Sequence, residues 1–379
     1  MQALLDRTLR PLASSGIARR AFWIAAALAF ACFLPFWVND TPEFPWVWSP
    51  WGSPIRNFQY SLVLLFATAL LGMTVLTGRA GLVSIGHGAF VAFGAYAAAI
   101  SMHEWDLHYA LAIPFAGLVG FALGGFFGLP ALRLSAHALT VVSISVALAL
   151  APIIKDSHFD QWTGGSTGLV VQPIDVPFGL SLTDDQWLYF VALMVFLFCL
   201  IVVWSLVGGR LGRAWVASRD HEIAAASMGV NLALYRTMAF AFAGLFAGLA
   251  GGLYTIIIQF VSPESFTVNL SILLLTGLVV GGRDTIIGVL PGAFFIQFVP
   301  IWTSDFTTEL DLERDISPSI VYGAVLIMVM FLMPGGFMGT FRQGWILAKR
   351  TPGFLRGERI YGPRVEPEKP IAGGSDDDE

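Results

Sequence analysis

Ten apolar runs that are long enough to cross a membrane, or nearly so, dominate this chain. A spanning helix needs about 20 apolar residues, because the hydrocarbon core of a bilayer is about 30 Å thick. Only 12% of the 379 residues are charged, whereas soluble proteins carry about 25%. The pattern predicts an all-α integral membrane protein of about ten transmembrane helices, at residues 21–38, 58–77, 82–102, 109–132, 138–154, 187–207, 237–260, 266–281, 285–302 and 317–334. The first run has a rival interpretation as a signal peptide, but it continues past the cleavage-like Ala29-Phe30-Ala31 as far as Val38.

The distribution of basic residues predicts the orientation. An even number of spans places both termini on one side of the membrane, and 18 of the 21 Lys and Arg residues then fall on that side. Only Arg56, Lys155 and Arg314 fall on the other side. Basic residues in short loops stay in the cytoplasm, so we expect both termini to be cytoplasmic.

This topology divides the chain into three parts. Residues 1–20 form a cytoplasmic N-terminal segment, and residues 21–334 form the transmembrane domain. Residues 335–379 form a cytoplasmic tail that is basic and then acidic, and its composition predicts partial disorder.

A polar segment at about 209–233 interrupts the apolar runs on the cytoplasmic side. It predicts a short helix in which Ser218 is the N-cap, with Asp220 and Glu222 near the positive end of the helix dipole. Gly229 can close the helix in the left-handed conformation. The residues between present a small, smooth face, and a helix in this position must contact something outside the membrane: Ile223, Ala224, Ala225, Ala226 and Met228.

The sequence offers no catalytic, nucleotide-binding or metal-binding pattern. None of its three lysines follows a glycine, so a GxxxxGK[ST] loop is absent and any ATP must be hydrolysed by a partner chain. Cys32 and Cys199 each lie inside an apolar run and are interpreted as small buried residues. We therefore expect a non-enzymatic chain with no bound cofactor or metal, and with no nucleic-acid partner.

His87 is the main ionisable residue inside a predicted span. It lies between Gly86 and Gly88, and with Gly81 and Gly94 these glycines predict a broken or closely packed helix. One interpretation is a histidine that packs helices or anchors a loop. Alternatively, Gly86, His87 and Gly88 line a translocation path; a metal ligand is disfavoured because no partner has ligand spacing.

Two further glycine patterns are present. Gly244, Gly248 and Gly252 form a GxxxGxxxG stripe, which predicts close helix packing or a subunit interface. Thr163, Gly164 and Gly165 lie in a predicted outer loop, as a tight turn or as a gate or docking surface.

A short internal match links two distant segments. Gly78-Arg79 precedes Gly88-Ala89-Phe90 at the same spacing at which Gly282-Arg283 precedes Gly292-Ala293-Phe294.

Several blocks together resemble the permease subunits of ABC importers for branched-chain amino acids, the LivH/LivM family, and most of all its LivM type. They span roughly residues 60–300 and are Gly78 to Phe90, Leu129 to Leu134, Thr163 to Leu169, Gly212 to Gly229, Gly251 to Tyr254, Ser262 to Phe266 and Gly281-Gly282.

The resemblance implies a type II ABC importer-like bundle in a bacterial inner membrane. Its partners are a second, LivH-like permease subunit, two cytoplasmic ABC ATPases and an external solute-binding protein, with lipid around the bundle. Residues Glu222 to Gly229 resemble the ATPase-coupling loop of ABC importers, with the expected coupling residues Arg213, Ser218, Glu222, Ala225 and Gly229.

The chain also departs from the family. Ser135-Ala136-His137-Ala138 replaces the usual Gly-Xaa-Tyr turn, and Leu148 stands where the family commonly has a glutamate. The expected function is import of branched-chain or similar amino acids by alternating access. The alternatives are a related system for urea, amides or small aromatic acids, or a carrier that works alone.

Overall fold

The structure is a computed structural model that describes residues 29–32, 34–35, 54–132, 136–174, 176, 182–309, 317–333 and 335–340. Some of the predictions above fall outside these residues: the segment 1–20, most of the run 21–38, Arg133, Ser135, Arg314 and the tail from residue 341.

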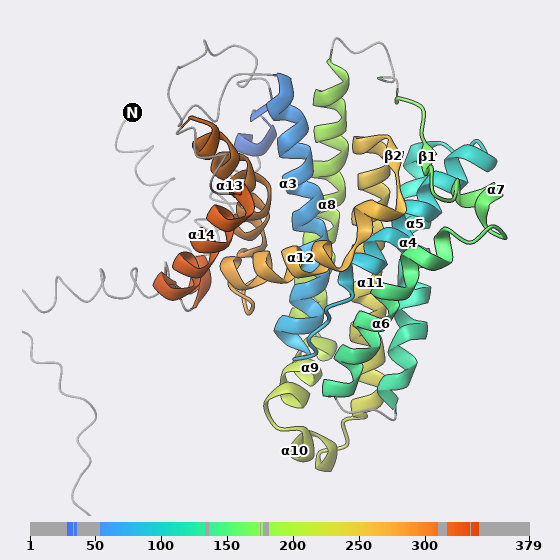
Figure 1. Cartoon of the computed structure of the whole chain (residues 1–379). Helices are drawn as coiled ribbons and strands as arrows, with labels where there is room; N and C mark the ends of the chain where they lie inside the picture. Colours follow the sequence, from blue (N-terminus) through green and yellow to red (C-terminus); the bar gives the residue numbers. More distant parts are fainter. Residues whose placement is uncertain are drawn as a thin grey trace, which may run out of the picture.

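The described residues are almost entirely helical, which confirms the predicted fold class (Figure 1). Helix α3 continues into a π-helical turn (η1), α5 continues into a 3₁₀ turn (η2), and a further 3₁₀ turn (η4) precedes α12. The elements are α3 (Pro54–Met73), η1 (Thr74–Arg79), α4 (His87–Glu104), α5 (Tyr109–Gly128), η2 (Leu129–Leu132), α6 (Ala136–Ile154), α7 (Asp160–Thr163), β1 (Leu169–Val170), α8 (Asp184–Gly208), α9 (Arg210–Asp220), α10 (Glu222–Ser227), α11 (Leu232–Ile258), β2 (Phe260–Val261), η4 (Pro263–Phe266), α12 (Val268–Gly281), α13 (Val289–Glu309) and α14 (Pro318–Leu332).

Five helices among the described residues are long and apolar enough to cross a membrane, at 57–79, 109–128, 184–208, 232–258 and 320–340. The other predicted spans after the first also form helices, and of these α6 and α12 are apolar but shorter. The most hydrophobic windows of α3 and α11 are 83% and 78% buried, whereas those of α8 and α14 are 28% and 6% buried. Helices α3 and α11 are therefore central, while α8 and α14 present their apolar surfaces outwards.

Glycines set the spacing of the central helices. A side chain on Gly244 would collide with the backbone of Gly120 in α5, and one on Gly251 would collide with Val91 in α4. A side chain on Gly248 would likewise collide with the carbonyl oxygen of Ala116 in α5. Lipid is as apolar as the helix surfaces, so helices in a membrane associate through close packing of this kind. The structure thus places the GxxxGxxxG stripe inside the chain's own bundle.

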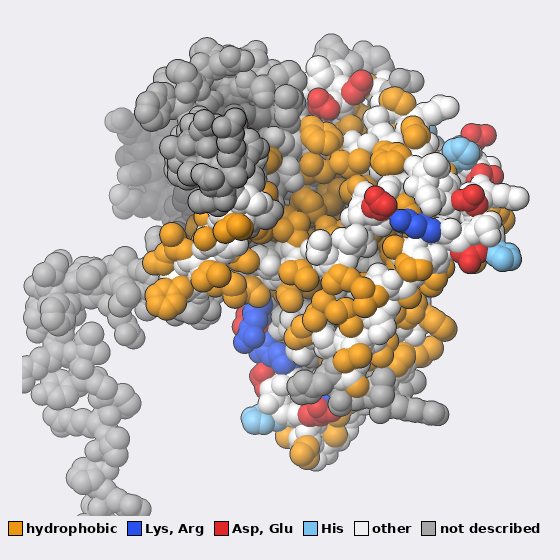
Figure 2. Space-filling view, viewed as in Figure 1, with side chains coloured by type: hydrophobic (Ala, Val, Ile, Leu, Met, Phe, Trp, Pro, Cys, Tyr) orange, Lys and Arg blue, Asp and Glu red, His pale blue; other side chains and the backbone are white. Residues whose placement is uncertain are grey.

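The loops gather at two ends of the bundle, and Figure 2 shows apolar side chains over much of the surface between them. The α10 end carries α9 and α10, and there Arg219 contacts Gly78 and Asp284. The strand end carries α7 and the antiparallel pair in which Leu169 faces Val261. Which end faces the cytoplasm is a prediction from the basic residues.

The contact between α5 and α11 generates a testable prediction. A Cβ at Gly124 would lie 2.5 Å from the Phe240 carbonyl oxygen, whereas at Gly125 the nearest atom is the Cβ of Ala241 at 3.7 Å. We expect Gly124→Ala to reduce the free energy of unfolding by about 1–3 kcal/mol through overpacking.

Thermal unfolding of the detergent-solubilised protein measures this effect. Gly125→Ala is the matched control and should unfold at or above the wild-type temperature. Equal stability of the two variants would contradict the close contact.

Candidate functional site

The loop of residues 209–231, called the α9–α10 loop below, projects from one end of the bundle (Figure 1). Trp215 fixes it to the central helix: this side chain is fully buried, and its indole N–H donates to the Tyr235 carbonyl oxygen of α11 at 2.8 Å. The Trp215 ring also meets Phe242 edge to face at 6.3 Å. The loop is therefore a packed part of the bundle.

Two helices form this loop where the sequence predicted one, and the expectation that Ser218 is an N-cap is wrong. Ser218 lies inside α9, three residues before the N-cap position of α10, and its hydroxyl donates to the Trp215 carbonyl oxygen at 2.8 Å. His221 takes the N-cap position without a side-chain bond. Asp220 ends α9, directly precedes the N-cap residue of α10 and accepts from Arg219 Nε at 3.0 Å, while Glu222 lies in the first turn of α10 as predicted.

The C-terminal end of α10 has the predicted geometry. Gly229 adopts φ +85°, in the left-handed region that favours glycine. The Gly229 N–H donates to the Ala226 carbonyl at 3.0 Å and the Val230 N–H to the Ala225 carbonyl at 3.1 Å. These two bonds form a Schellman motif, which satisfies the last carbonyls of the helix. Asn231 then caps α11 by accepting from the Leu234 N–H at 3.1 Å.

The side chains of α10 and of its C-cap residue have two kinds of surroundings. Glu222 forms an ion pair with Arg236 of α11, and Ala225 is buried against the protein. Ile223 and Met228 are 85% and 86% exposed. Two large apolar side chains at the tip of a projecting loop form a surface suited to a partner, and we call Ile223 and Met228 the apolar tip.

Arg219 joins this loop to two other connections, a role that the sequence did not reveal. Its Nη1 donates to the Gly78 carbonyl oxygen at 2.6 Å and to the Asp284 carboxylate at 2.8 Å. Partial burial lowers the pKa of Arg219, but hydrogen bonds and charges from Asp220 and Asp284 outweigh this and hold the pKa above its ordinary value. The guanidinium is therefore charged at any physiological pH. The Arg213 side chain donates to the carbonyl oxygen of Gly208, the last residue of α8, at 3.2 Å.

His87 begins α4 in the interior of the protein. It is fully buried, and its Nε2 lies 3.2 Å from the Ala69 carbonyl oxygen of α3. Gly88 N–H donates to Ser271 Oγ of α12 at 2.8 Å, and a side chain on Gly86 would collide with Ser143 of α6. In this conformation the three residues hold helices together. Their role along a translocation path stays a prediction.

The Thr163 to Gly165 segment is a tight turn at the strand end. Gly164 and Gly165 both have positive φ, of +68° and +52°. The Thr163 hydroxyl lies 3.0 Å from the Ile154 carbonyl and 3.2 Å from the Gly165 N–H. The turn leads into β1, which joins this loop to the connection between α11 and α12.

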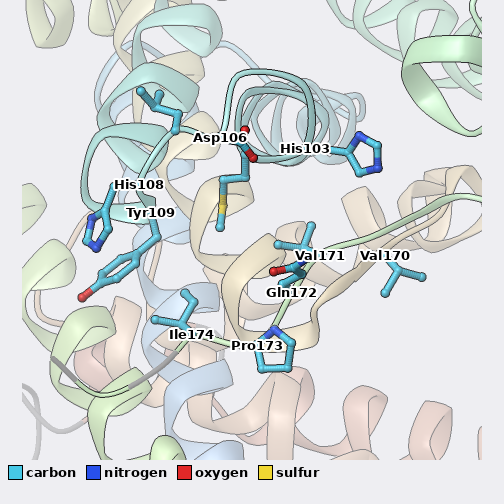
Figure 3. Close-up of a pocket in the computed structure, with 11 residues that line it drawn as sticks. His103, Asp106, His108, Tyr109, Val170, Val171, Gln172, Pro173 and Ile174 are labelled. Carbon is cyan, nitrogen blue, oxygen red and sulfur yellow. The ribbon is translucent and has the colours of Figure 1, made fainter. Parts of the chain in front are cut away.

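The strand end also contains a pocket of about 430 Å³ that sequence reasoning missed (Figure 3). The turn between α4 and α5 forms one wall and residues 170–174 form another, so segments about 65 residues apart must meet to create it. Positive φ at Asp106 (47°) shapes the turn. The polar side chains that line the pocket are His103, Asp106, His108, Tyr109 and Gln172.

No group of three or more His, Cys, Asp or Glu side chains that could hold a metal occurs among the residues that the structure describes.

Comparison with known proteins identifies relatives. The model of a family described as "Branched-chain amino acid transport system / permease component" matches residues 58–333. The chain is 30% identical over 303 residues to the high-affinity branched-chain amino acid transport system permease protein LivM of Salmonella typhimurium, covering 73% of this chain and 68% of that protein. The LivM protein of Escherichia coli is 29% identical with the same coverage.

A more distant relative is the autoinducer 2 import system permease protein LsrC of Salmonella choleraesuis, 29% identical over 40% of this chain and 47% of that protein. Among solved structures, PsaBC from Streptococcus pneumoniae in complex with Fab matches with a TM-score of 0.39 and 14% identity, covering 73% of this chain and 90% of that chain.

The Schellman motif at Gly229 generates a second prediction. A Cβ would meet no atom within 4 Å at Gly229 or at Gly208, so the two glycines differ in backbone conformation and not in available space. Gly229→Ala should weaken the end of α10 by about 1–2 kcal/mol, because a left-handed conformation strains an L-residue.

Amide hydrogen exchange at residues 228–230 measures the loss and should be faster in Gly229→Ala. Gly208→Ala is the control and should leave exchange at these amides unchanged. If the two variants exchanged alike, the left-handed cap would not hold α10 closed.

Proposed function

This chain belongs to the branched-chain amino acid transport system permease family, and from that premise we propose that it is the membrane-spanning subunit of an ATP-driven importer. Its solutes are branched-chain or similar amino acids, the class named for its LivM relatives. The chain itself is a multi-pass membrane permease component, and the membrane is the inner membrane of a bacterium.

The apolar tip of α10 is the observation that carries the coupling part of this proposal. Ile223 and Met228 are exposed on a loop whose base is buried and bonded to α11. An isolated pair of large apolar side chains gains free energy when a partner covers it, about 1.5–3 kcal/mol for each fully buried side chain. A cytoplasmic ATPase with a complementary cleft is the partner that the family supplies.

The attachments of the α9–α10 loop suit a transfer of motion. Trp215 and the Glu222–Arg236 pair link it to α11. Closure of two ATPases on ATP would move the loop, and the attached helices would follow as a body. Alternation between outward-open and inward-open bundles then moves solute without any ATP chemistry in this chain.

The complete importer needs further subunits. A second, LivH-like permease would complete the membrane path, two ABC ATPases would bind the loops, and a solute-binding protein would bind the opposite face. The outward apolar side chains of α8 and α14 suit lipid or a second permease subunit, among them Met194, Phe198, Ile201, Ile327 and Phe331. The spans carry few fixed charges, which favours a path of low solute affinity with selectivity in the binding protein.

Transport energetics test this function directly. The chain reconstituted alone should show no uptake of radiolabelled leucine when a proton or sodium gradient is imposed. Uptake should appear when a second permease subunit, two ABC ATPases and a solute-binding protein are added with ATP. Gradient-driven uptake by the chain alone would contradict the proposal and favour an independent carrier.

The apolar tip generates a separate prediction. Ile223→Glu places a charge where the ATPase should bury an apolar side chain. We expect the affinity of the ATPases for the membrane subunits to fall on the order of 10- to 100-fold, the equivalent of the lost burial.

Co-purification of the ATPases at graded concentrations measures this affinity. Ala217→Glu introduces the same side chain at an exposed position of α9 and should leave the affinity near the wild-type value. Equal losses in both variants would show that charge anywhere on the loop, and not loss of the apolar tip, weakens assembly.

A further inference from the structure

Two connections from distant parts of the chain meet at the α10 end. One is the end of η1 at Gly78, and the other is the turn from Gly282 to Asp284 between α12 and α13. A side chain on Gly78 would collide with the Arg283 carbonyl oxygen, so the two backbones are in direct contact. These are the two segments that share the Gly-Arg pair in the internal sequence match. The match therefore marks two turns that touch each other.

Arg219 binds both turns from a third segment. One nitrogen, Nη1, donates to the Gly78 carbonyl oxygen at 2.6 Å and to the Asp284 carboxylate at 2.8 Å. Gly81, with φ +72°, leaves room for the stem, because a Cβ there would lie 2.5 Å from Arg219 Cγ. The connection after η1 is thus shaped to receive this side chain.

The planar guanidinium suits this position. It can direct several N–H groups to different acceptors at once, whereas a lysine ammonium is a compact, mobile charge. The side chain of Arg219 is 31% exposed, so water competes for its bonds and the junction can be remade during a conformational cycle. By contrast, the Glu222–Arg236 pair ties the loop to α11 alone.

We propose that Arg219 is the positioning residue that carries movement of the α9–α10 loop to both the α3–α4 connection and the α12–α13 connection. This inference rests on the proposed function, since it assigns the route by which ATPase closure reaches the two sides of the bundle. Trp215 moves α11 with the loop, and Arg219 makes the two turns follow. Without Arg219, ATPase closure would still occur, but less of it would become movement of α12 and α13.

The experiment compares variants in proteoliposomes that contain the whole importer. Arg219→Gln removes the cation, and Asp284→Ala removes one of its two bridged acceptors. Both variants should assemble with the ATPases and hydrolyse ATP, while leucine uptake per ATP hydrolysed falls about fivefold or more, the lower end of usual coupling energies. Arg219→Lys and Asp284→Asn should restore part of the ratio.

Asp220→Ala is the matched control. Asp220 also accepts from Arg219, at 3.0 Å, but it belongs to α9 itself. Its loss therefore leaves the contacts of Arg219 with Gly78 and Asp284 in place. This variant should keep the wild-type ratio of uptake to ATP. The double variant Arg219→Gln with Asp284→Ala should lose little more than Arg219→Gln alone, because both changes break the same bridge.

Three results would overturn the inference. The first is an unchanged uptake per ATP in Arg219→Gln and Asp284→Ala. The second is a loss of uptake that only follows a loss of assembled complex or of thermal stability. The third is an equal loss in Asp220→Ala. If the wild-type chain failed to bind the ATPases at all, the proposed function itself would fall, which distinguishes the two failures.

Discussion

Helices in hydrocarbon gain little by exchanging lipid contacts for apolar protein contacts, so their association depends on how closely the backbones can approach. In this bundle that condition is met along α11, where Gly244, Gly248 and Gly251 admit the backbones of α5 and α4. Helix α11 also packs against α3, and 83% of the most hydrophobic stretch of α3 is buried. The remaining helices take their positions around this centre.

The central helix also determines what the projecting loop can do. Arg236 binds Glu222, the Tyr235 carbonyl accepts from Trp215, and Asn231 caps the helix start, so the first turns of α11 hold both α9 and α10. A force applied at the apolar tip therefore reaches the most tightly packed part of the bundle over a short distance. A loop attached only by flexible ends would lose this displacement in its own bending.

Local chemistry allowed the sequence to predict the helical membrane fold, the glycine contacts and the left-handed residue at Gly229. Each of these depends on neighbours within a few residues or on the length of an apolar run. The N-cap prediction at Ser218 failed because α9 continues through this residue. A serine inside a helix can donate to a carbonyl about one turn earlier, here that of Trp215, and no short pattern separates the two outcomes.

Long-range contacts were beyond reach for a different reason. Arg219 meets Gly78 across 141 residues and Asp284 across 65, and a single sequence holds no record of which loops converge. In the sequence, Arg219 looked like one more positive charge on the predicted cytoplasmic side. The repeated Gly-Arg pair was the available signal, and it acquired meaning only when the structure placed the two turns in contact. The pocket at the strand end was missed for the same reason.

The two-residue pairing of β1 with β2 has a consequence for how the molecule opens. Leu169 and Val170 face Val261 and Phe260, with Leu169 and Val261 buried and Val170 71% exposed, so few backbone bonds hold the pair together. Ribbons this short have little stability of their own. Local unfolding at this point costs far less free energy than separation of α11 from α5. The strand end can thus loosen and re-form while the glycine-packed centre stays closed.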